Sequence, residues 1–556
     1  MKNIVFSLIA VFTITSTVIA QEDTVDTYNE SVTVVGAYDP TLMVFPKINE
    51  KPVVNDTSEL KRDLEYTIFP QPLKTSYETK PFSAAKMSGE PFKELYGNYI
   101  RLGGGMNKTI FGDLYLNTKR DKEKSVGLHL KHLSSSGSIT DYAFTGNSNN
   151  LAELYYSRFR KRSSIHLNAF FDRETIHYYG FNPNELITPI DKDDYKQRYN
   201  YSGLNFVWQS AHTDSSHTNY RLNMKYGAFW DLDESLDHNI FMNGFLHKNV
   251  RWLSISKYQG IGVKMENEYV LSHRSFNDYS AGALNIRPYV NTNLGLIFIE
   301  LGANLAMDID TNSEAKIYPH IQMDLNLLPG TITAFGGVDG NVTYDSYLRL
   351  SRENPFIHYQ VENTHAFTDR ELYGGIRGNL GKRFSYSITG RQKKISNYAL
   401  FVNDTLTNLG HWYGVVRDEI NMFTASFDAL MKIKEKWSTR LSFSYNDVDA
   451  VNEKYAWHIP NYEGTLTIGY NLADKFIVRT SLFVVGSRWA RQYTGSEFIA
   501  LKLDPIFDGN LSFEYRYSKV LSGFLQFNNI AAQKYMLWNQ YPAYRFQVLG
   551  GVTYAF

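Results

Sequence analysis

From about residue 95 to its end, the chain alternates apolar and polar residues with a period of two. The pattern is clearest in six segments: 126–131, 165–172, 221–228, 321–327, 440–446 and 511–518. Successive side chains of a β-strand point to opposite faces, so each segment has one apolar face and one polar face. No comparable helical repeat appears. The alternation therefore predicts a chain that is almost entirely β-sheet.

The length of this pattern separates a membrane barrel from a soluble sheet protein. Soluble sandwiches have polar outward rows and rarely continue past ~250 residues as one domain. Here one row stays apolar and aromatic, and aromatic residues make up 15% of the chain, with 40 Tyr and 35 Phe. That excess is typical of aromatic girdles at two membrane interfaces. We predict a single large transmembrane antiparallel β-barrel over residues 96–556, with about 22 strands and a range of 16–22.

The last strand supports the same interpretation. Between Tyr544 and Phe556 one row is almost wholly apolar and ends in Val552, Tyr554 and Phe556. In a barrel, the last strand closes the sheet and presents outward aromatic residues near the interface. The ending resembles the C-terminal assembly signal of outer-membrane proteins, which implies recognition by the barrel assembly machinery and contact with outer-membrane lipids. The alternative is an edge strand of a soluble sandwich.

The beginning of the chain indicates export. Met1 to Asn3 is a short positive start, residues 4–19 are mostly apolar, and Ala20 precedes a polar stretch. This is the pattern of a secretory signal peptide over residues 1–20, and a membrane anchor is the alternative. The chain has no Cys, which excludes disulfides and thiolate metal sites. Basic and acidic residues balance at 57 each, so no basic field indicates nucleic acid as a partner.

Residues 21–95 differ from the rest because prolines interrupt every candidate element. We predict an extended segment that lies in the periplasm or occludes the lumen. It contains one β-prone run, Val32, Thr33, Val34 and Val35. Such a run can add as a strand to the exposed sheet edge of a partner. The alternatives are docking on the protein's own barrel and a disordered tail.

Several stretches resemble TonB-dependent receptors of Gram-negative bacteria. The run Val32 to Val35 resembles the TonB box. The other stretches are residues 38–40, residues 47–49, Pro52, the expected turn at residues 131–137, and residues 353–356. The resemblance implies a barrel in the cell outer membrane, uptake of a solute, and TonB or another periplasmic or outer-membrane protein as a partner. One departure is large. Only about 75 residues precede the first strand, so a classical plug domain is not expected.

The connections between predicted strands fall into two classes. Tight turns at 105–107, 162–163 and 328–330 would form the periplasmic connections. Longer polar stretches would form surface loops: 134–150, 182–194, 351–369 and 488–504. An asymmetry between short and long connections is expected of outer-membrane barrels.

Candidate chemistry is sparse. Asp308 to Asn312 begins like a calcium loop, but it lacks the turn Gly and the closing Glu, so a hairpin turn is preferred. Three further groups each allow a structural and a chemical interpretation. Residues 231–234 form either a solvated turn or a cation site, and residues 455–460 form either an interface girdle or a binding platform. Three histidines either line the lumen or belong to a lipase-like site. The histidines are His129, His132 and His166. We predict no enzyme, no cofactor and no metal site.

A barrel of about 22 strands would be a wide hole unless something fills it. Three solutions are open. Residues 21–95 or inward-folded loops could fill the lumen, the barrel could have only 16–18 strands and be porin-like, or it could be a closed scaffold. We predict passage or uptake of a solute across the outer membrane. The alternative is a non-transporting barrel that scaffolds or assists assembly of an outer-membrane complex.

Phe556→Asp tests the expected role of the last residue. The substitution puts a charge in place of an outward aromatic at the interface, and we expect less of the protein to insert. The measurement is the fraction of heat-modifiable, membrane-extracted protein on a gel. Phe556→Tyr, which keeps the ring, should insert like the native chain. Normal insertion of Phe556→Asp would contradict the barrel prediction.

Overall fold

The computed structural model describes residues 97–556, apart from 119–120, 187–188, 212–216, 252–253, 255, 257–258, 275–276, 404–410, 435 and 494–496. The expected signal peptide, the segment 21–95 and the run Val32–Val35 lie outside the described residues. Within them, no helix is long and apolar enough to cross a bilayer.

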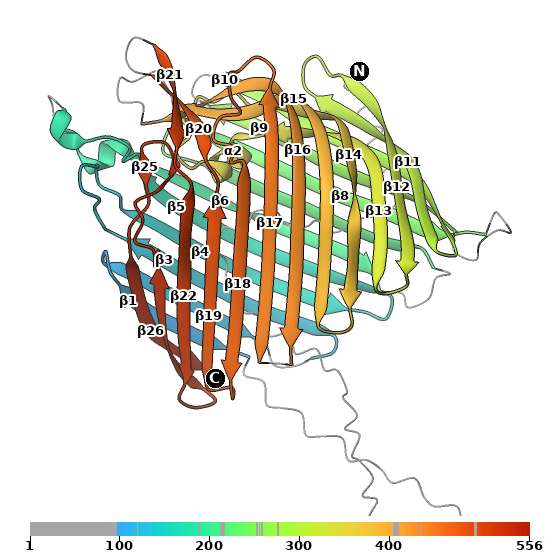
Figure 1. Cartoon of the computed structure of the whole chain (residues 1–556), viewed down its shortest axis with the longest axis horizontal. Coiled ribbons are helices and arrows are strands. Elements are labelled where there is room, and N and C mark those ends of the chain that lie inside the picture. Colours follow the sequence, from blue (N-terminus) through green and yellow to red (C-terminus); the bar gives the residue numbers. More distant parts are fainter. Residues whose placement is uncertain are drawn as a thin grey trace, which may run out of the picture. The chain divides into compact units, whose positions relative to one another are not determined.

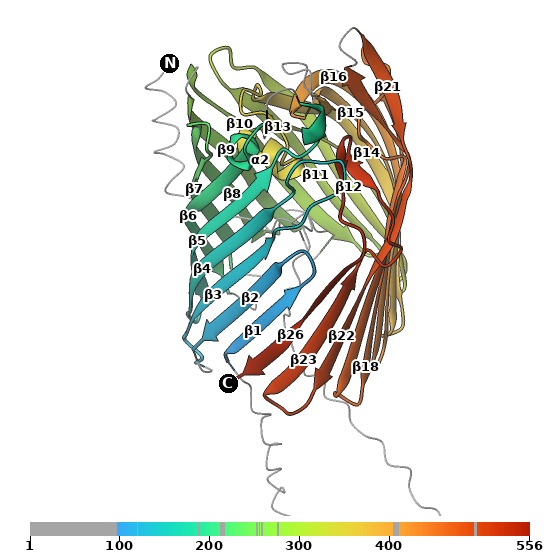
Figure 2. The same cartoon turned by 90° about the vertical axis from the view of Figure 1, so that its left-hand side faces the viewer.

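Twenty-two strands form one antiparallel sheet that closes on itself, as Figures 1 and 2 show. Each strand pairs with its neighbours in sequence, and β1 pairs with β26 to complete the ring. The fold class and the count of 22 predicted from the sequence are confirmed. A narrower barrel of 16–18 strands is excluded. The barrel strands are β1 (Tyr99–Gly105), β2 (Thr109–Asn117), β3 (Lys124–Ser135), β4 (Asn147–Phe159), β5 (Ser163–His177), β6 (Lys196–Ser210), β7 (Asn219–Trp230), β8 (Leu236–Asn249), β9 (Gln259–Arg274), β10 (Asn277–Leu294), β11 (Ile297–Ile309), β12 (Ala315–Leu328), β13 (Ile332–Asp345), β14 (Thr364–Leu380), β15 (Phe384–Asn403), β16 (Tyr413–Ile433), β17 (Trp437–Ala450), β18 (Tyr462–Leu472), β19 (Phe476–Val485), β22 (Ile506–Arg516), β23 (Leu521–Asn528) and β26 (Gln547–Ala555).

The remaining elements lie in connections between barrel strands. In the part of the chain that the structure describes, this set consists of one α-helix, two short 3-10 helices and two small two-stranded sheets. They are α2 (Tyr347–Glu353), η1 (Pro183–Glu185), η2 (Lys192–Tyr195), the hairpin β20 (Arg488–Tyr493) with β21 (Phe498–Leu503), and β24 (Met536–Trp538) with β25 (Tyr541–Pro542).

The two ends of the barrel carry different connections. We call the end that holds the carboxyl terminus the terminal rim, and the opposite end the loop rim. Short turns at 160–162, 295–296, 329–331, 381–383 and 473–475 lie at the terminal rim. Long connections lie at the loop rim, among them 136–146, 178–195, 346–363, 451–461 and 486–505. The predicted division into turns and loops is therefore confirmed.

Three details of that prediction are wrong. The turn at 105–107 joins β1 to β2 at the loop rim, because β1 runs away from the terminal rim. Residues 131–135 are not a turn but the end of β3. The expected loop 488–504 contains the paired strands β20 and β21, since this connection forms its own hairpin.

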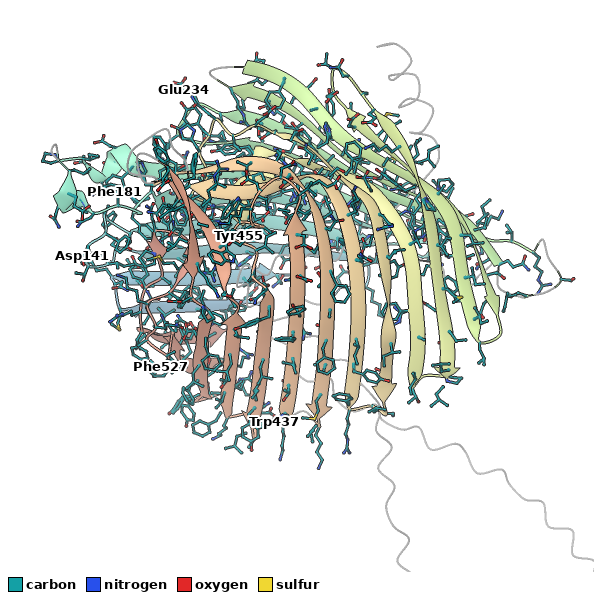
Figure 3. All side chains as sticks on the ribbon, turned by 45° about the horizontal axis from the view of Figure 1, so that its top comes forward. Asp141, Phe181, Glu234, Trp437, Tyr455 and Phe527 are labelled. Carbon is teal, nitrogen blue, oxygen red and sulfur yellow. The ribbon has the colours of Figure 1, made fainter. Side chains whose placement is uncertain are left out.

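The outward row of side chains is apolar, as the alternation predicted. Large exposed apolar residues follow the outer face, including Ile321, Met323 and Phe513. Figure 3 places Trp437 at the terminal rim and Glu234 at the loop rim. Exposed aromatic residues gather where strands approach the terminal rim, which is the position of an interface girdle. They are Phe159, Trp208, Tyr470, Phe476, Tyr515, Tyr554 and Phe556.

The inward row is polar and its groups are paired across strands. His129 on β3 is the clearest case, because its ring nitrogens lie 2.9 Å from Asp113 and 3.2 Å from Glu153. Glu153 also accepts a 3.3 Å hydrogen bond from Asn168. Buried charges are expected to be paired in this way. The row therefore lines the lumen with neutralised groups.

One side of the barrel folds over on itself. Asn285 of β10 donates to the Val342 carbonyl of β13 at 2.8 Å and accepts from the Val342 amide at 3.0 Å. Asn304 of β11 donates to the Gly340 carbonyl at 2.7 Å. Strands that are not neighbours in the sheet are thus joined through their inner faces. We call this part, made by β10, β11, β13 and β14, the fold-over.

The seam between β1 and β26 is built on glycine. Gly103 lies opposite Gly551, and Gly104 lies opposite Gly550. The ring of Phe524, on β23, covers the first pair, and the Arg101 guanidinium lies 3.9 Å from the centre of that ring. A Cβ at Gly551 would collide with this ring and with the Leu102 carbonyl oxygen. The closing strands therefore approach most closely at the Gly103–Gly551 pair, where a Cβ on either residue would be too close to its neighbours.

Gly551→Ala should weaken the closed barrel. Overpacking of this kind costs roughly 1–3 kcal/mol of the free energy of unfolding. Denaturant unfolding in detergent measures the loss. Gly390→Ala is the matched control, because its Cβ would meet only ordinary contacts at 3.9 Å and beyond. Equal stability of the two variants would contradict the proposed packing at the seam.

Candidate functional site

The connection between β13 and β14 folds into the mouth of the barrel at the loop rim. We call residues 346–363 the lid segment; it contains α2 (Figures 1 and 2). Ser346 caps the start of the helix by accepting a hydrogen bond from the Arg349 amide, and Asn354 follows its last turn. Pro355 then prevents the helix from continuing. A short, capped helix is what this sequence dictates.

The buried face of α2 contacts the wall formed by β6 and β7. The Tyr347 ring is fully buried, and its centre lies 5.5 Å from Phe229 and 6.1 Å from Tyr199. Its hydroxyl donates a 2.9 Å hydrogen bond to Oδ2 of Asp231, in the connection between β7 and β8. Aromatic burial of this size contributes strongly to packing. Tyr347 therefore anchors the lid segment to this wall.

The second half of the lid segment pairs with the start of β16. Ile357 and Tyr413 form a parallel bridge. The His358 amide donates to the Tyr413 carbonyl at 2.8 Å, and the Tyr413 amide donates to the Phe356 carbonyl at 3.0 Å. The lid segment thus reaches from the β6–β7 wall to β16 and satisfies its backbone groups there.

A third contact comes from the connection between β23 and β26. The Tyr541 ring stacks on Phe356 with ring centres 3.6 Å apart and an angle of 14°. Tyr541 is buried, and its neighbour Asn539 accepts a 2.9 Å hydrogen bond from the Tyr413 hydroxyl through its carbonyl. The lid segment is therefore held between three separate parts of the wall.

Arginine side chains also attach the lid segment to the wall, and Arg274 and Arg352 are two of them. Arg274 of β9 donates to the carbonyls of Tyr359 and Val361 at 3.0 Å each, and it pairs with Asp237 at 3.5 Å. Arg352 of α2 lies 3.8 Å from Asp172 of β5. The first arginine is buried, whereas the second is half exposed. Exposed ion pairs contribute little, so Arg274 is the stronger attachment.

Beside the lid segment lies an aromatic group with two unsatisfied polar atoms. The Trp412 ring centre is 4.6 Å from both His358 and His411. His411 Nδ1 and Trp412 Nε1 are buried and have no hydrogen-bond partner among the described residues. Burial, together with His358, lowers the pKa of His411 to about 4, so its ring is neutral at pH 7. Orphaned buried groups are costly, so a molecule bound here would gain by pairing with these two atoms.

Comparison with known proteins was made by sequence and by structure. No protein-family profile matches the chain, and no curated protein sequence is similar to it. The pyoverdine outer membrane receptor FpvA from Pseudomonas aeruginosa PAO1 is similar in structure, with a TM-score of 0.61 and 10% identity, over 84% of this chain and 79% of that one. The fold is that of outer-membrane receptor barrels.

Two further structures agree with that assignment. The siderophore receptor PirA from Acinetobacter baumannii has a TM-score of 0.61 at 10% identity, covering 83% of this chain and 80% of that one. The FrpB iron transporter from Neisseria meningitidis has a TM-score of 0.59 at 10% identity, over 84% and 81%. Identities this low establish the fold of the chain.

The acidic turn at 231–234 is not the solvated turn that the sequence suggested. Glu234 is exposed, but Asp231 is buried and bonded to Tyr347 of the lid segment. Burial of the Asp231 carboxyl raises its pKa to about 6. No sequence pattern links these two residues, because they lie far apart in the chain and meet only when the lid segment folds inward.

The three histidines do not form a common site. His129 and His166 lie on inward rows, whereas His132 lies on the outer face with Asn150 and Ser134. His166 contacts the Ser157 hydroxyl at 2.8 Å. Among the described residues, none of the three joins a serine hydroxyl to a carboxylate. The lumen-lining interpretation holds for two of them.

The aromatic residues at 455–460 serve as internal packing. Trp457 is buried and donates to Glu453 at 2.8 Å, and Tyr455 stacks on Trp489 with ring centres 4.3 Å apart. Both the girdle and the platform interpretations are therefore wrong for Trp457. The segment Asp308–Asn312 spans the end of β11 and the turn into β12, as preferred from the sequence.

The predicted C-terminal residues lie at the seam. Val552, Tyr554 and Phe556 are 54%, 48% and 47% exposed on the outer face. The backbone of Phe556 exchanges two hydrogen bonds with Asn98, of 2.9 and 3.2 Å. Their role as an assembly signal stays a prediction.

Asp231→Asn should change how stability depends on pH. The raised pKa means that the protonated carboxyl stabilises the folded state below the ordinary value of 3.8, and that this stabilisation is lost as the pH rises through about 6. Asn cannot ionise and can still accept from Tyr347. The variant's free energy of unfolding should therefore rise relative to that of the native chain between about pH 4 and pH 7, by at most about 3 kcal/mol.

Thermal unfolding in detergent at several pH values gives this difference directly. Glu234→Gln removes an exposed charge from the same turn. The difference in stability between this variant and the native chain should not change with pH. If the difference in stability between Asp231→Asn and the native chain were also independent of pH, the burial of the Asp231 carboxyl would be contradicted.

Proposed function

We propose that the protein takes up a solute across the outer membrane, in the manner of the TonB-dependent receptors that it resembles. The observation that carries this proposal is the lid segment in the mouth of a 22-stranded barrel. Barrels of this size have a lumen wide enough to need filling. A wide barrel with an inward-folded, non-covalently held segment suits controlled passage rather than an open pore.

The attachments of the lid segment support a gate. It is covalently joined only to β13 and β14, and its contacts with the other walls are hydrogen bonds, ring stacking and ion pairs. The unsatisfied atoms of His411 and Trp412 lie beside it. A solute with a flat ring and both a donor and an acceptor would satisfy these atoms. Its binding would shift the lid segment toward whichever arrangement holds the solute more tightly.

The amino-terminal part of the chain completes the proposal. Residues 1–20 direct export and are removed, and residues 21–95 precede the barrel without forming a classical plug. The run Val32–Val35 adds as a strand to TonB, which supplies the energy. Outer-membrane lipids surround the outward apolar row, and the barrel assembly machinery reads the final strand.

A second function, a closed barrel that scaffolds an outer-membrane complex, is favoured by one observation. The central residues of the lid contacts, Tyr347, Ile357 and Tyr413, are all fully buried. Packing of this quality suits permanent closure as well as a gate. Uptake predicts that a solute is depleted from the medium. A scaffold predicts that partner proteins are lost from the outer membrane when the barrel is absent.

The test compares cells that produce the native protein, no protein, Val34→Pro or Val34→Ala. Proline removes a backbone donor and fixes φ, so it blocks strand addition, whereas alanine preserves the backbone. Mass spectrometry of the spent medium measures which solutes are depleted. We expect one solute class to be depleted by the native and Val34→Ala cells and not by the other two.

Equal depletion by all four strains would contradict uptake. Loss of co-purifying outer-membrane proteins from the cells without the barrel, with unchanged depletion, would favour the scaffold. Membrane fractions probed for heat-modifiable barrel confirm that Val34→Pro still assembles.

A further inference from the structure

Two carboxylates and one imidazole meet at the loop rim of the fold-over. Asp308 ends the inward row of β11, Asp310 lies in the turn that follows, and His365 is the second residue of β14. One ligand atom from each lies within 4.8 Å of the other two. Asp308 and His365 are buried, whereas Asp310 is exposed and open to solvent.

The orientation of the imidazole makes this more than an acidic cluster. His365 is only 5% exposed, and its Nε2 lies 2.6 Å from the Gly282 carbonyl, so Nε2 carries the proton and donates. In the neutral ring, Nδ1 is then an acceptor. That atom points at Oδ2 of Asp310, 3.8 Å away. A buried acceptor therefore faces two carboxylates, which are acceptors as well.

Such an arrangement is completed by a positive charge between its members, which is either a proton on Nδ1 of His365 or a bound cation. Among the described residues, no Lys or Arg is paired with either carboxylate, and the nearby Lys316 is engaged by Glu314 and Asp369. A separation of 3.8 Å is too long for a hydrogen bond. Two ligands that bind one ion at about 2.1 Å would be this far apart at an angle of about 130°, above the tetrahedral value, so a bound ion would draw them slightly closer together.

We propose that Asp308, Asp310 and His365 bind one divalent transition ion of the Zn²⁺ class, with water as the fourth ligand. The mixed set of imidazole and carboxylate favours such an ion over Ca²⁺ or Mg²⁺, which take oxygen ligands. The hydrogen bond from Nε2 to the Gly282 carbonyl fixes the ring in the orientation that a ligand needs. This inference does not depend on the proposed transport.

The site would join the β11–β12 hairpin to the start of β14, directly after the lid segment. Thr364, the first residue of β14, follows the last lid residue in the chain. A bound ion would therefore fix the point at which the lid segment returns to the barrel wall. The ion acts as a structural clamp and takes part in no reaction.

The test uses the untagged mature protein in detergent, stripped of metal with a chelator and titrated with Zn²⁺ by calorimetry and with Co²⁺ by visible absorption. We expect one ion per chain. Asp310→Asn and His365→Gln should each weaken Zn²⁺ binding at least about tenfold. Asp310 is exposed, so its variant tests the site without disturbing the core if His365→Gln fails to fold.

His273→Gln is the matched control. His273 and Asp278 form another histidine–carboxylate pair at the loop rim, 3.4 Å apart and exposed, and its loss should leave Zn²⁺ binding unchanged. Absence of saturable Zn²⁺ binding would overturn the proposal, as would equal binding by all the variants. Saturable binding of Ca²⁺ without Zn²⁺ would also overturn it, because an imidazole ligand would then have no part.

Discussion

Backbone pairing between the first and last strands of the barrel is the constraint on which the rest of the structure depends. In lipid, every backbone amide and carbonyl must be satisfied within the protein, and a sheet meets that demand only by closing. Seven pairs from Tyr99–Ala555 to Gly105–Leu549 close it here. The glycine pairs of the seam let the two strands approach under Phe524. Closure also places the start of β1 beside the end of β26, and hence fixes at which rim the long connections lie.

A closed ring of 22 strands leaves a wide interior, and the polar inward row cannot fill it by itself. Two features reduce that space at the loop rim. The fold-over brings β10 against β13 through Asn285 and Asn304. The lid segment brings a helix and an aromatic core between the β6–β7 wall and β16. The fold-over and the lid segment both depend on contacts between inner faces that lie far apart in the sequence. A barrel with a narrower lumen would not need such contacts to fill its interior.

The sequence predicted whatever depends on local periodicity. Alternation in segments such as 511–518 reports directly which side chains face lipid, so the fold class, the strand count and the outward terminal row could all be derived. The helix α2 is too short to show a helical period, and only its last three residues lie in the stretch 351–369 that was expected to be a surface loop. Its capping residue Ser346 and the stop at Pro355 were the available signals.

Contacts made across the lumen could not be predicted in the same way. Asp231 looked like part of a solvated turn because its partner, Tyr347, lies in a distant connection. Asp308 and Asp310 were expected to form only a hairpin turn, because His365, the third member of their cluster, comes from another strand. Period-two patterns state which face a residue occupies, but they do not state which parts of an inner face meet when loops fold inward.

The central claim is that the lid segment closes the mouth of the barrel. Single-channel conductance in planar bilayers tests it most directly, in a chain that lacks residues 21–95 so that only the barrel is measured. One form keeps the lid segment, and in the other a short Gly-Ser linker replaces residues 347–362. The account predicts low conductance with the lid segment and large, stable openings without it. Equal conductance of the two forms, or a wide open pore with the lid segment in place, would contradict the account.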